Sequence, residues 1–250
     1  MTQARPKQTE PSPPRVPLTL ILFGLMIAAT IAGMAWAAQQ LADPAALPIR
    51  RVMVEGEFTH LTPEHVQTAV VGAVHGGFFG VKVNEIRRLL LDDPWVRDAN
   101  ISRVWPDGLH VTIVEQIPIA RWGDYGLLNE RADIFVPAPE ELPHDLVQLS
   151  GPLGTEIEVL ERYGYIRAQL AEVGLTPVAV ALSDRQAWTI TTGGRREILL
   201  GRRDLEARLA RFKWGYTRGL NAAWERIGHV DMRYTNGFAV GERVAGLRNG

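Results

Sequence analysis

Residues 18–38 read L-T-L-I-L-F-G-L-M-I-A-A-T-I-A-G-M-A-W-A-A, a run of 21 residues without a charged side chain. An α-helix rises about 1.5 Å per residue, so this run makes a helix of about 31 Å, close to the ~30 Å hydrocarbon core of a bilayer. The run therefore predicts a transmembrane helix, and every other part of the chain is placed relative to it.

The charges beside this run predict its orientation. Residues 1–17 carry one acid, Glu10, and three basic residues, Arg5, Lys7 and Arg15. Basic residues are retained on the cytoplasmic side of membrane helices. We therefore expect an N-terminus in the cytoplasm and an exported chain from residue 39 onward, which is a single-pass type II topology.

A cleaved secretory signal is the competing interpretation of the same run. Ala35-Trp36-Ala37 has the small-x-small spacing of a signal-peptidase site. The apolar region of a signal peptide is typically about 7 to 15 residues long, which is shorter than this run. The length favours a retained anchor.

Composition narrows the class of the exported part. The chain has no cysteine, so neither disulfides nor thiolate metal ligands are available. Its formal net charge is −1, and nothing resembles the concentrated basic face of a nucleic-acid-binding protein. With 46% hydrophobic residues, the exported part is expected to fold around its own core.

The segments next to the anchor have the composition of tails and linkers. Residues 1–17 contain five prolines among polar residues, a composition that cannot bury a core, and we expect a disordered cytoplasmic tail. Residues 39–48 are expected to form a linker, and residues 244–250 a C-terminal tail.

Residues 49–116 show the element order β-α-α-β-β. Thr62-Pro63-Glu64 has the residue types favoured at a helix N-terminus, with a hydroxyl N-cap, proline at the first helical position and an acid near the positive end of the helix dipole. A second helix is expected after Asn84, with Ile86, Leu89 and Leu90 facing inward. The predicted strands are Arg50–Glu55, Trp95–Trp105 and Leu109–Glu115, the last two joined by the turn Pro106-Asp107-Gly108.

Residues 117–243 are expected to form a mixed, mainly antiparallel β domain with packed helices. Two helices are predicted, Glu156–Val173, closed by Gly174, and Arg202–Leu220. Residues 137–152 are expected to be loop-like, and Gly193-Gly194 and Asn236-Gly237 to be tight turns. The predicted strands are Ile117–Trp122, Gly126–Asn129, Ala132–Val136, Thr176–Leu182, Ala187–Thr192, Arg196–Leu200, Gly228–Tyr234 and Phe238–Val240. The tryptophans expected in the core from their strand patterns are Trp95, Trp105, Trp122 and Trp188.

No pattern in the chain indicates catalysis, a metal or a cofactor. The six histidines show no i, i+4 pair and no H-E-x-x-H, and no G-x-S-x-G, S-x-x-K or Walker sequence occurs. We therefore expect a non-enzyme without a cofactor or a small-molecule substrate. A cell-wall hydrolase with an unfamiliar site is the enzymatic alternative, and it would have to release soluble fragments from peptidoglycan.

Three motifs resemble a known family. Residues 93–122, D-P-W-V-R-D-A-N-I-S-R-V-W-P-D-G-L-H-V-T-I-V-E-Q-I-P-I-A-R-W, are similar to a POTRA domain of the FtsQ/DivIB cell-division family. L-G-R-R-D-L-E-A-R-L-A-R-F from Leu200 and V-D-M-R-Y-T-N-G-F-A-V-G from Val230 are similar to the C-terminal β domain of that family. In fold class, the resemblance implies an α+β protein with one transmembrane helix (18–38), a POTRA domain (49–116) and a β domain (117–243).

The resemblance also implies a function. Members of this family act as divisome scaffolds at the septum, where they bind FtsB and FtsL through the C-terminal part of the β domain. FtsB contributes a segment that pairs with the last strand, and the POTRA domain takes part in recruitment among components such as FtsK and FtsW/FtsI-like proteins. The positions that match the family's partner-binding residues are Arg185, Arg233, Tyr234, Gly237, Phe238, Ala239 and Val240.

General properties of these positions give simpler interpretations. Asn-Gly is the strongest short hairpin signal, so Asn236-Gly237 is expected as a turn whether or not a partner binds there. Arg185 and Arg233 would by default be solvated surface residues. An adaptor or chaperone for outer-membrane barrel assembly or secretion is the alternative function, because POTRA units serve such systems by edge pairing.

Overall fold

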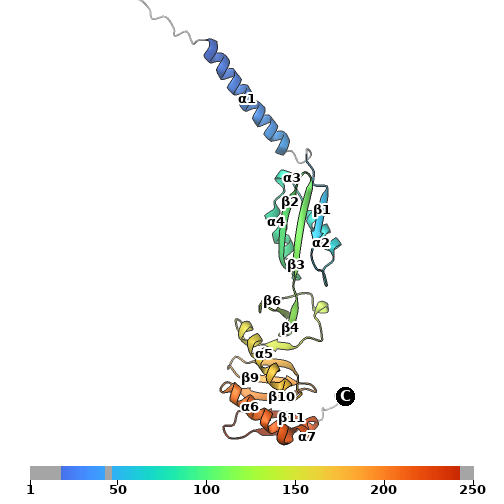
Figure 1. Cartoon of the computed structure of the whole chain (residues 1–250), viewed down its shortest axis with the longest axis vertical. Coiled ribbons are helices and arrows are strands. Elements are labelled where there is room, and N and C mark those ends of the chain that lie inside the picture. Colours follow the sequence, from blue (N-terminus) through green and yellow to red (C-terminus); the bar gives the residue numbers. More distant parts are fainter. Residues whose placement is uncertain (1–17, 43–46, 243–250) are drawn as a thin grey trace, which may run out of the picture. The chain divides into compact units, whose positions relative to one another are not determined.

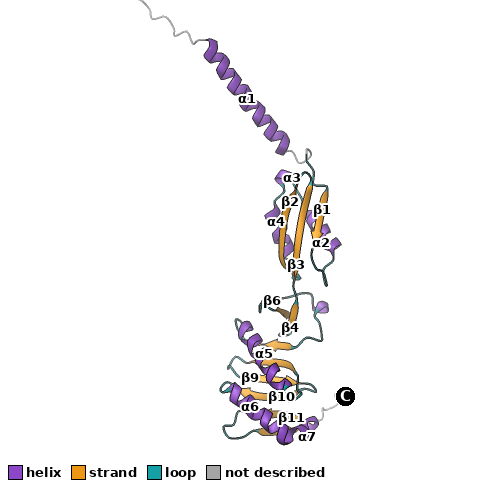
Figure 2. Ribbon diagram, in the orientation of Figure 1, coloured by secondary structure: helices purple, strands orange, loops and turns teal. Residues whose placement is uncertain are grey.

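The computed structural model describes residues 18–42 and 47–242 (Figures 1 and 2). The predicted disordered tail at 1–17 and the C-terminal tail at 244–250 lie outside the described residues. The described residues carry an N-terminal helix, a three-stranded sheet and a nine-stranded sheet, each of the two sheets with packed helices. This architecture confirms the expected α+β class.

Helix α1 spans Leu18–Ala42 without interruption and contains the predicted run. Its window Thr19–Gln39 has a mean hydropathy of 2.1, and none of the window is buried. Among the described residues it is the helix long and apolar enough to cross a membrane. It continues four residues past the predicted end at Ala38.

The chain forms two compact units, and strands β2 and β3 contribute residues to both. The first unit comprises the chain up to Glu55 with residues 62–90 and 99–112, and the second comprises residues 56–61, 91–98 and 113 onward.

The three-stranded sheet has the order β1-β3-β2, with β1 (Arg51–Glu55) parallel to β3 (Gly108–Glu115) and β2 (Val96–Val104) on the other side. Helices α2 (Pro63–Ala73), α3 (Gly77–Gly80) and α4 (Val83–Leu91) lie between β1 and β2 in the chain. The buried side chains of the first unit include Val66, Val70, Ile86, Leu90, Leu109 and Val111.

Local signals placed α2 correctly and α4 less well. The Thr62 hydroxyl accepts a hydrogen bond from the His65 N–H at 3.2 Å, and Pro63 opens the helix as predicted. Helix α4, however, begins at Val83, so Asn84 lies inside it and is not its N-cap. Leu89, expected to face inward, is exposed, because Ile86 and Leu90 alone fill the buried stripe of this short helix.

The nine-stranded sheet has the order β12-β11-β10-β9-β8-β7-β4-β5-β6. Three neighbouring pairs, β10–β11, β4–β7 and β7–β8, are parallel, and the other five pairs are antiparallel. The strands are β4 Pro118–Trp122, β5 Gly126–Asn129, β6 Ile134–Phe135, β7 Gln148–Ser150, β8 Pro177–Leu182, β9 Trp188–Thr192, β10 Arg196–Gly201, β11 Ile227–Asp231 and β12 Ala239–Glu242.

The helices of the second unit pack on the nine-stranded sheet and share one large hydrophobic core with it. Helix α5 (Glu156–Ala171) lies near β7 and β8. Helix α6 (Leu205–Gly215) lies near β10, as Figure 2 shows. After α6 the chain continues through a π-helical turn (Tyr216–Leu220), α7 (Asn221–Ala223) and a 3-10 turn (Trp224–Arg226). Core side chains include Trp122, Leu149, Ile166, Leu170, Ile190, Leu209 and Phe212.

Several sequence expectations for the second unit are wrong. The stretch 137–152, expected to be loop-like, contains a 3-10 turn (Pro139–Glu141) and β7, an interior strand of the sheet. The predicted helix Arg202–Leu220 in fact begins at Leu205, so Arg202 and Arg203 precede α6. In α5, Val159 is buried and Ile157 is exposed, although helical periodicity from Leu160, Tyr163, Ile166 and Leu170 predicted Ile157 on the same face.

Two predicted turns also differ. Thr192 pairs with Arg196, so the loop between β9 and β10 has three residues, with Gly194 (φ 74°) and Arg195 (φ 58°) both left-handed, where the sequence predicted two. Asp231 pairs with Ala239, so seven residues, 232–238, connect β11 to β12, and Asn236-Gly237 is not a two-residue hairpin turn.

Three of the four tryptophans expected in the core are buried, namely Trp95, Trp122 and Trp188. Trp105 is not, since 76% of its surface is exposed. Trp105 lies in the turn between β2 and β3, where the alternation of side chains along a strand no longer predicts which of them are buried.

Candidate partner-binding edge of the second sheet

Strand β12 forms one edge of the nine-stranded sheet. It pairs with β11 on one side, with Val230 opposite Val240 and Asp231 opposite Ala239. Ala239 is exposed, and Val240 is 45% exposed. The other side of β12 is the outer edge of the sheet, and Ala239-Val240-Gly241 carries none of the charged residues that normally protect an edge.

Two arginines of α6 hold the 232–238 loop. Arg211 donates three hydrogen bonds to backbone carbonyls, to Met232 at 2.8 Å, Tyr234 at 2.8 Å and Thr235 at 2.9 Å. Arg208 donates to the carbonyls of Leu200 and Arg233. Neither arginine is among the residues predicted for the partner site. Carbonyl acceptors leave no signal in the sequence.

Arg233 is fixed by a carboxylate two residues earlier in the chain. Its guanidinium donates to Asp231 at 2.6 to 3.0 Å, and its backbone N–H donates to Asp231 Oδ1 at 3.0 Å. The side-chain bond from Arg233 lowers the pKa of Asp231 and raises the pKa of Arg233. The Asp231 side chain is 10% exposed and that of Arg233 is 61% exposed, so a cation is presented at the surface in a fixed orientation.

Tyr234 and Phe238 differ in exposure although both were predicted at the partner site. Tyr234 is 59% exposed, and it lines a shallow surface hollow of about 450 Å³ with residues 235–239, which include Gly237. Phe238 is half-buried and packs against the main core. A Cβ on Gly215 of α6 would lie 2.8 Å from the Phe238 ring. Phe238 therefore ties the start of β12 to α6.

Arg185 lies at the same end of the sheet as Arg233. The registers show that β8, β10 and β11 run in the same direction, so the loops after β8 and after β11 leave the sheet at one end. Arg185 is exposed in the β8–β9 loop, which closes at the pair Leu182–Trp188. Trp188 pairs in turn with Gly201, and a Cβ on Gly201 would lie 3.0 Å from Arg233 Cγ.

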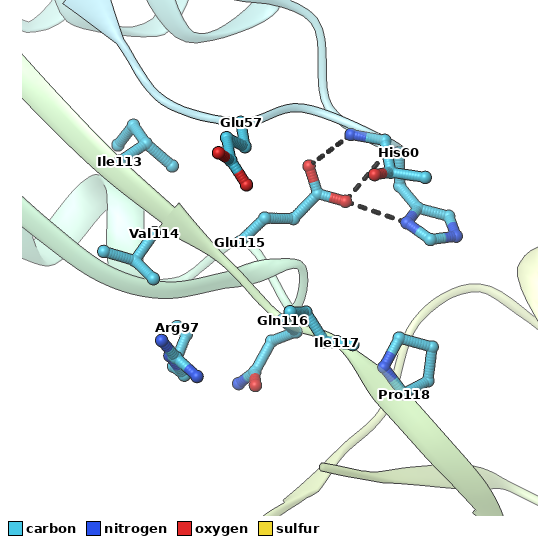
Figure 3. Close-up of a pocket in the computed structure, with 10 residues that line it drawn as sticks. Glu57, His60, Arg97, Ile113, Val114, Glu115, Gln116, Ile117 and Pro118 are labelled. Atoms are coloured by element: carbon cyan, nitrogen blue, oxygen red, sulfur yellow. Dashed lines mark hydrogen bonds and ion pairs between the residues drawn. The ribbon is translucent and has the colours of Figure 1, made fainter. Parts of the chain in front are cut away.

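A second polar site of the second unit lies at the end of β3, as Figure 3 shows. The buried Glu115 carboxylate accepts hydrogen bonds from the N–H groups of Thr59 (2.9 Å) and His60 (2.8 Å), and it contacts His60 Nδ1 at 2.8 Å. The His60 ring stacks on Trp95 at 3.7 Å, and Trp95 Nε1 donates to Glu141. Neighbouring residues, among them Glu57, Arg97, Ile113 and Pro118, line a hollow of about 480 Å³.

We call Glu115 a structural latch, because its carboxylate binds the backbone of residues 59–61 to the end of β3. Burial by itself would raise the pKa of Glu115, but the bonds from Thr59, His60 and Leu61 outweigh burial and lower this pKa. Backbone N–H groups supply most of its donors, which anchors residues 59–61 to the end of β3. The sequence carried a signal for this latch, since Glu115 continues the buried alternation of Leu109, Val111 and Ile113.

Within residues 18–42 and 47–242, no three histidine, aspartate or glutamate side chains gather in a group able to hold a metal ion.

The fold and the edge define a class, namely membrane-anchored proteins that carry a β-α-α-β-β unit and a larger sheet whose edge strand is uncharged over Ala239–Gly241. Residues 47–116 match the family model "POTRA domain, FtsQ-type", and residues 120–233 match "Cell division protein FtsQ/DivIB, C-terminal". The chain belongs to the FtsQ/DivIB family of cell division proteins.

Named relatives support this assignment over most of the chain. The cell division protein FtsQ of Coxiella burnetii is 34% identical over 200 residues, which cover 80% of this chain and 82% of the relative. That of Hahella chejuensis is 34% identical over 216 residues, 86% of this chain and 75% of the relative. That of Shewanella oneidensis is 36% identical over 203 residues, 80% of this chain and 76% of the relative.

Proposed function

We propose that this chain is a divisome scaffold of the cell inner membrane that binds an FtsB-type partner by strand addition at the outer edge of β12. The relatives are named as cell division proteins, and α1 provides one apolar helix long enough to anchor the chain. The basic residues before α1 support a cytoplasmic N-terminus and periplasmic domains at the septum.

The unprotected edge of β12 is the observation that carries this proposal. In strand addition, backbone groups supply affinity and alternate side chains supply selectivity. Strand β12 is short, uncharged over Ala239–Gly241 and outermost in its sheet. An added strand would extend the sheet by one and cover the exposed Ala239 and Val240.

The charged residues beside this edge favour an acidic partner segment. Arg185 and Arg233 lie at one end of the sheet, and Arg233 is held by Asp231 in a fixed orientation. A guanidinium binds a carboxylate through two parallel bonds when its geometry is fixed in advance. Arg233, Tyr234 and the hollow over residues 234–239 would therefore bind side chains of the added segment.

The three-stranded sheet has edges of its own. In the order β1-β3-β2, both β1 and β2 are outermost. We assign recruitment among the other division proteins, FtsK and FtsW/FtsI-like components, to this part of the chain, while FtsB and FtsL bind the β12 edge. In this function the chain links early and late division proteins without chemical turnover.

A lysine at Ala239 tests the proposed edge. Ala239 is exposed, so A239K adds an edge charge without disturbing the core. We expect the full chain carrying A239K to capture the FtsB–FtsL pair about tenfold less well, because about 1.4 kcal/mol of strand pairing is lost. The matched control is A168K, at an exposed alanine on α5, which should capture the pair normally.

Retained capture by A239K would refute the edge assignment, and so would an equal loss in A168K. Phe238 is unsuitable for this test, because a lysine there would also disturb the packing on Gly215. Enrichment of outer-membrane barrel-assembly factors in place of FtsB and FtsL would favour the adaptor function.

A further inference from the structure

Two segments of the first unit, α3 and the β2–β3 turn, are bonded to the residues that come shortly after α1 in the chain. These two segments form one end of the first unit. The N–H of Phe78, in α3, donates to the Leu47 carbonyl at 2.9 Å. The N–H of Arg50 donates to the Asp107 carbonyl at 2.8 Å, and the Arg51 guanidinium binds the Asp107 carboxylate at 2.7 Å. Helix α3 is thus bonded to Leu47, near the end of the linker, and the β2–β3 turn is bonded to Arg50 and Arg51, just after the linker.

The length of the linker limits how far this end lies from the membrane. Helix α1 ends at Ala42, only three residues after the apolar window that ends at Gln39. From Ala42 to Leu47 the chain advances five residues, which span at most about 18 Å when fully extended. The Phe78 Cα therefore lies within about 25 Å of the Cα of Ala42, the last residue of α1, whatever the path of the linker.

Large aromatic side chains are exposed at this end. Trp105, at the β2–β3 turn, is 76% exposed, and Phe79, in α3, is 54% exposed. Exposed tryptophan is costly in water, whereas tryptophan is enriched at the headgroup level of membranes, where its ring is partly apolar and its N–H is wet.

Basic side chains accompany these aromatics. Lys82, Arg88 and Arg103 line a surface hollow of about 580 Å³ together with Phe79, and its lining residues include one acid, Glu85, which pairs with Lys82 at 2.8 Å. Arg103 also holds the α3 loop in place, donating to the carbonyls of Phe78 at 3.0 Å and Val81 at 2.7 Å. Three cations and one acid give the hollow a positive charge beside an exposed aromatic ring.

We propose that this end of the first unit docks on the surface of the bilayer that α1 spans. Trp105 and Phe79 lie among the lipid headgroups, and Lys82 and Arg88 bind the phosphates of anionic phospholipids. The short linker supports a lipid surface as the occupant, since it keeps both loops near the headgroups, and the charge of the hollow complements an anionic membrane. The docking rests on α1 spanning the bilayer, and it applies on either side of the membrane.

A fluorescent label at Gly80 tests the docking. The chain has no cysteine, and a Cβ at Gly80 or at Gly193 meets no atom within 4 Å, so G80C and G193C each create one labelling site with little disturbance. The full chain is placed in vesicles of phosphatidylcholine with about one quarter phosphatidylglycerol, and quenching by nitroxide-headgroup lipid is measured. We expect strong quenching of the label at Gly80 and weak quenching at Gly193, in the β9–β10 loop.

Charge reversal identifies the lipid group that is bound. Two cations near an anionic surface contribute about 1 kcal/mol each, and the two new carboxylates are repelled, so K82E/R88E should lower the docked-to-free ratio of the Gly80-labelled chain by a factor of at least about 30. The control R167E/R226E makes the same change of charge at exposed arginines of the second unit and should keep the quenching. Vesicles of phosphatidylcholine alone should reproduce the K82E/R88E result.

Equal quenching at Gly80 and Gly193 would overturn the docking. Quenching at Gly80 that survives K82E/R88E, or that is unchanged without phosphatidylglycerol, would overturn the assignment to anionic headgroups. Capture of the FtsB–FtsL pair by K82E/R88E is measured in parallel, because the β12 edge should still bind its partner when docking fails. The two proposals can therefore fail separately.

Discussion

Arg211 offers the sharpest test of how the β12 edge is held. Its guanidinium makes three bonds to carbonyls of the 232–238 loop, at 2.8, 2.8 and 2.9 Å. The bond to Met232 is partly buried and those to Tyr234 and Thr235 are exposed. Replacing Arg211 with methionine keeps much of the apolar stem and removes all three bonds.

The expected effect follows from those three bonds. A bond from a charged donor contributes about 1.5 kcal/mol when partly buried, and we take about half of that for each exposed one, which gives about 3 kcal/mol. The loss falls on the loop and on the four-residue strand β12 that it precedes. We therefore expect R211M to raise the local opening constant of the β11–β12 pair about 100-fold, since 1.4 kcal/mol corresponds to tenfold.

Hydrogen exchange of the β11 and β12 amides in the full chain measures this opening constant. R211K retains a charge but cannot reach three carbonyls from one ammonium group, so it should give an intermediate effect of about tenfold. R167M, at an exposed arginine of α5, is the control and should exchange like the parent chain. A change of less than about threefold in R211M would refute the inference that Arg211 holds this edge.

Two other sites give independent predictions. G215A places a Cβ 2.8 Å from the Phe238 ring and should destabilise the chain by about 1–3 kcal/mol in guanidinium denaturation. G164A, on α5 where a Cβ meets nothing within 4 Å, should stabilise it by about 0.5–1 kcal/mol, and the reverse order would contradict the packing described here. Because the folded-state pKa of Glu115 is lowered, its contribution to stability is present above its unfolded-state pKa of about 4.3 and is lost as the pH falls through the lower folded value. E115Q should therefore lower the free energy of unfolding by about 2 kcal/mol at pH 7 and by progressively less below about pH 4. An equal loss at both pH values would exclude a stabilising role for the charged Glu115 carboxylate.

Strong local signals predicted much of the fold. The uncharged run gave α1, Thr62-Pro63 gave the start of α2, and the alternation of Leu109, Val111 and Ile113 gave the buried face of β3. Each of these signals depends on residues close together in the chain. Strand β7 was not predicted, because its three residues lie among prolines in the sequence. These residues are held by the parallel strands β4 and β8, which are distant in the sequence.

The candidate binding edge was predicted only in part. The last strand was predicted from its sequence pattern and β12 is outermost in its sheet, whereas the partner-binding positions were proposed through the family resemblance. The seven-residue loop, the half-buried Phe238 and the carbonyl bonds of Arg211 were not predicted. They depend on α6 lying beside this loop, and no periodicity reports a contact between a side chain and a distant backbone.

The sequence by itself determined the anchor, the order of the two folded parts and most helices and strands, because hydropathy, capping and alternation act over a few residues. The tertiary structure alone decided which arginines hold the 232–238 loop and which tryptophan stayed in water. Trp105 and Trp95 have similar apolar neighbours in the sequence, yet one is exposed and the other buried. The physical reason is that burial and hydrogen-bond partners depend on segments brought together by folding, which local sequence does not specify.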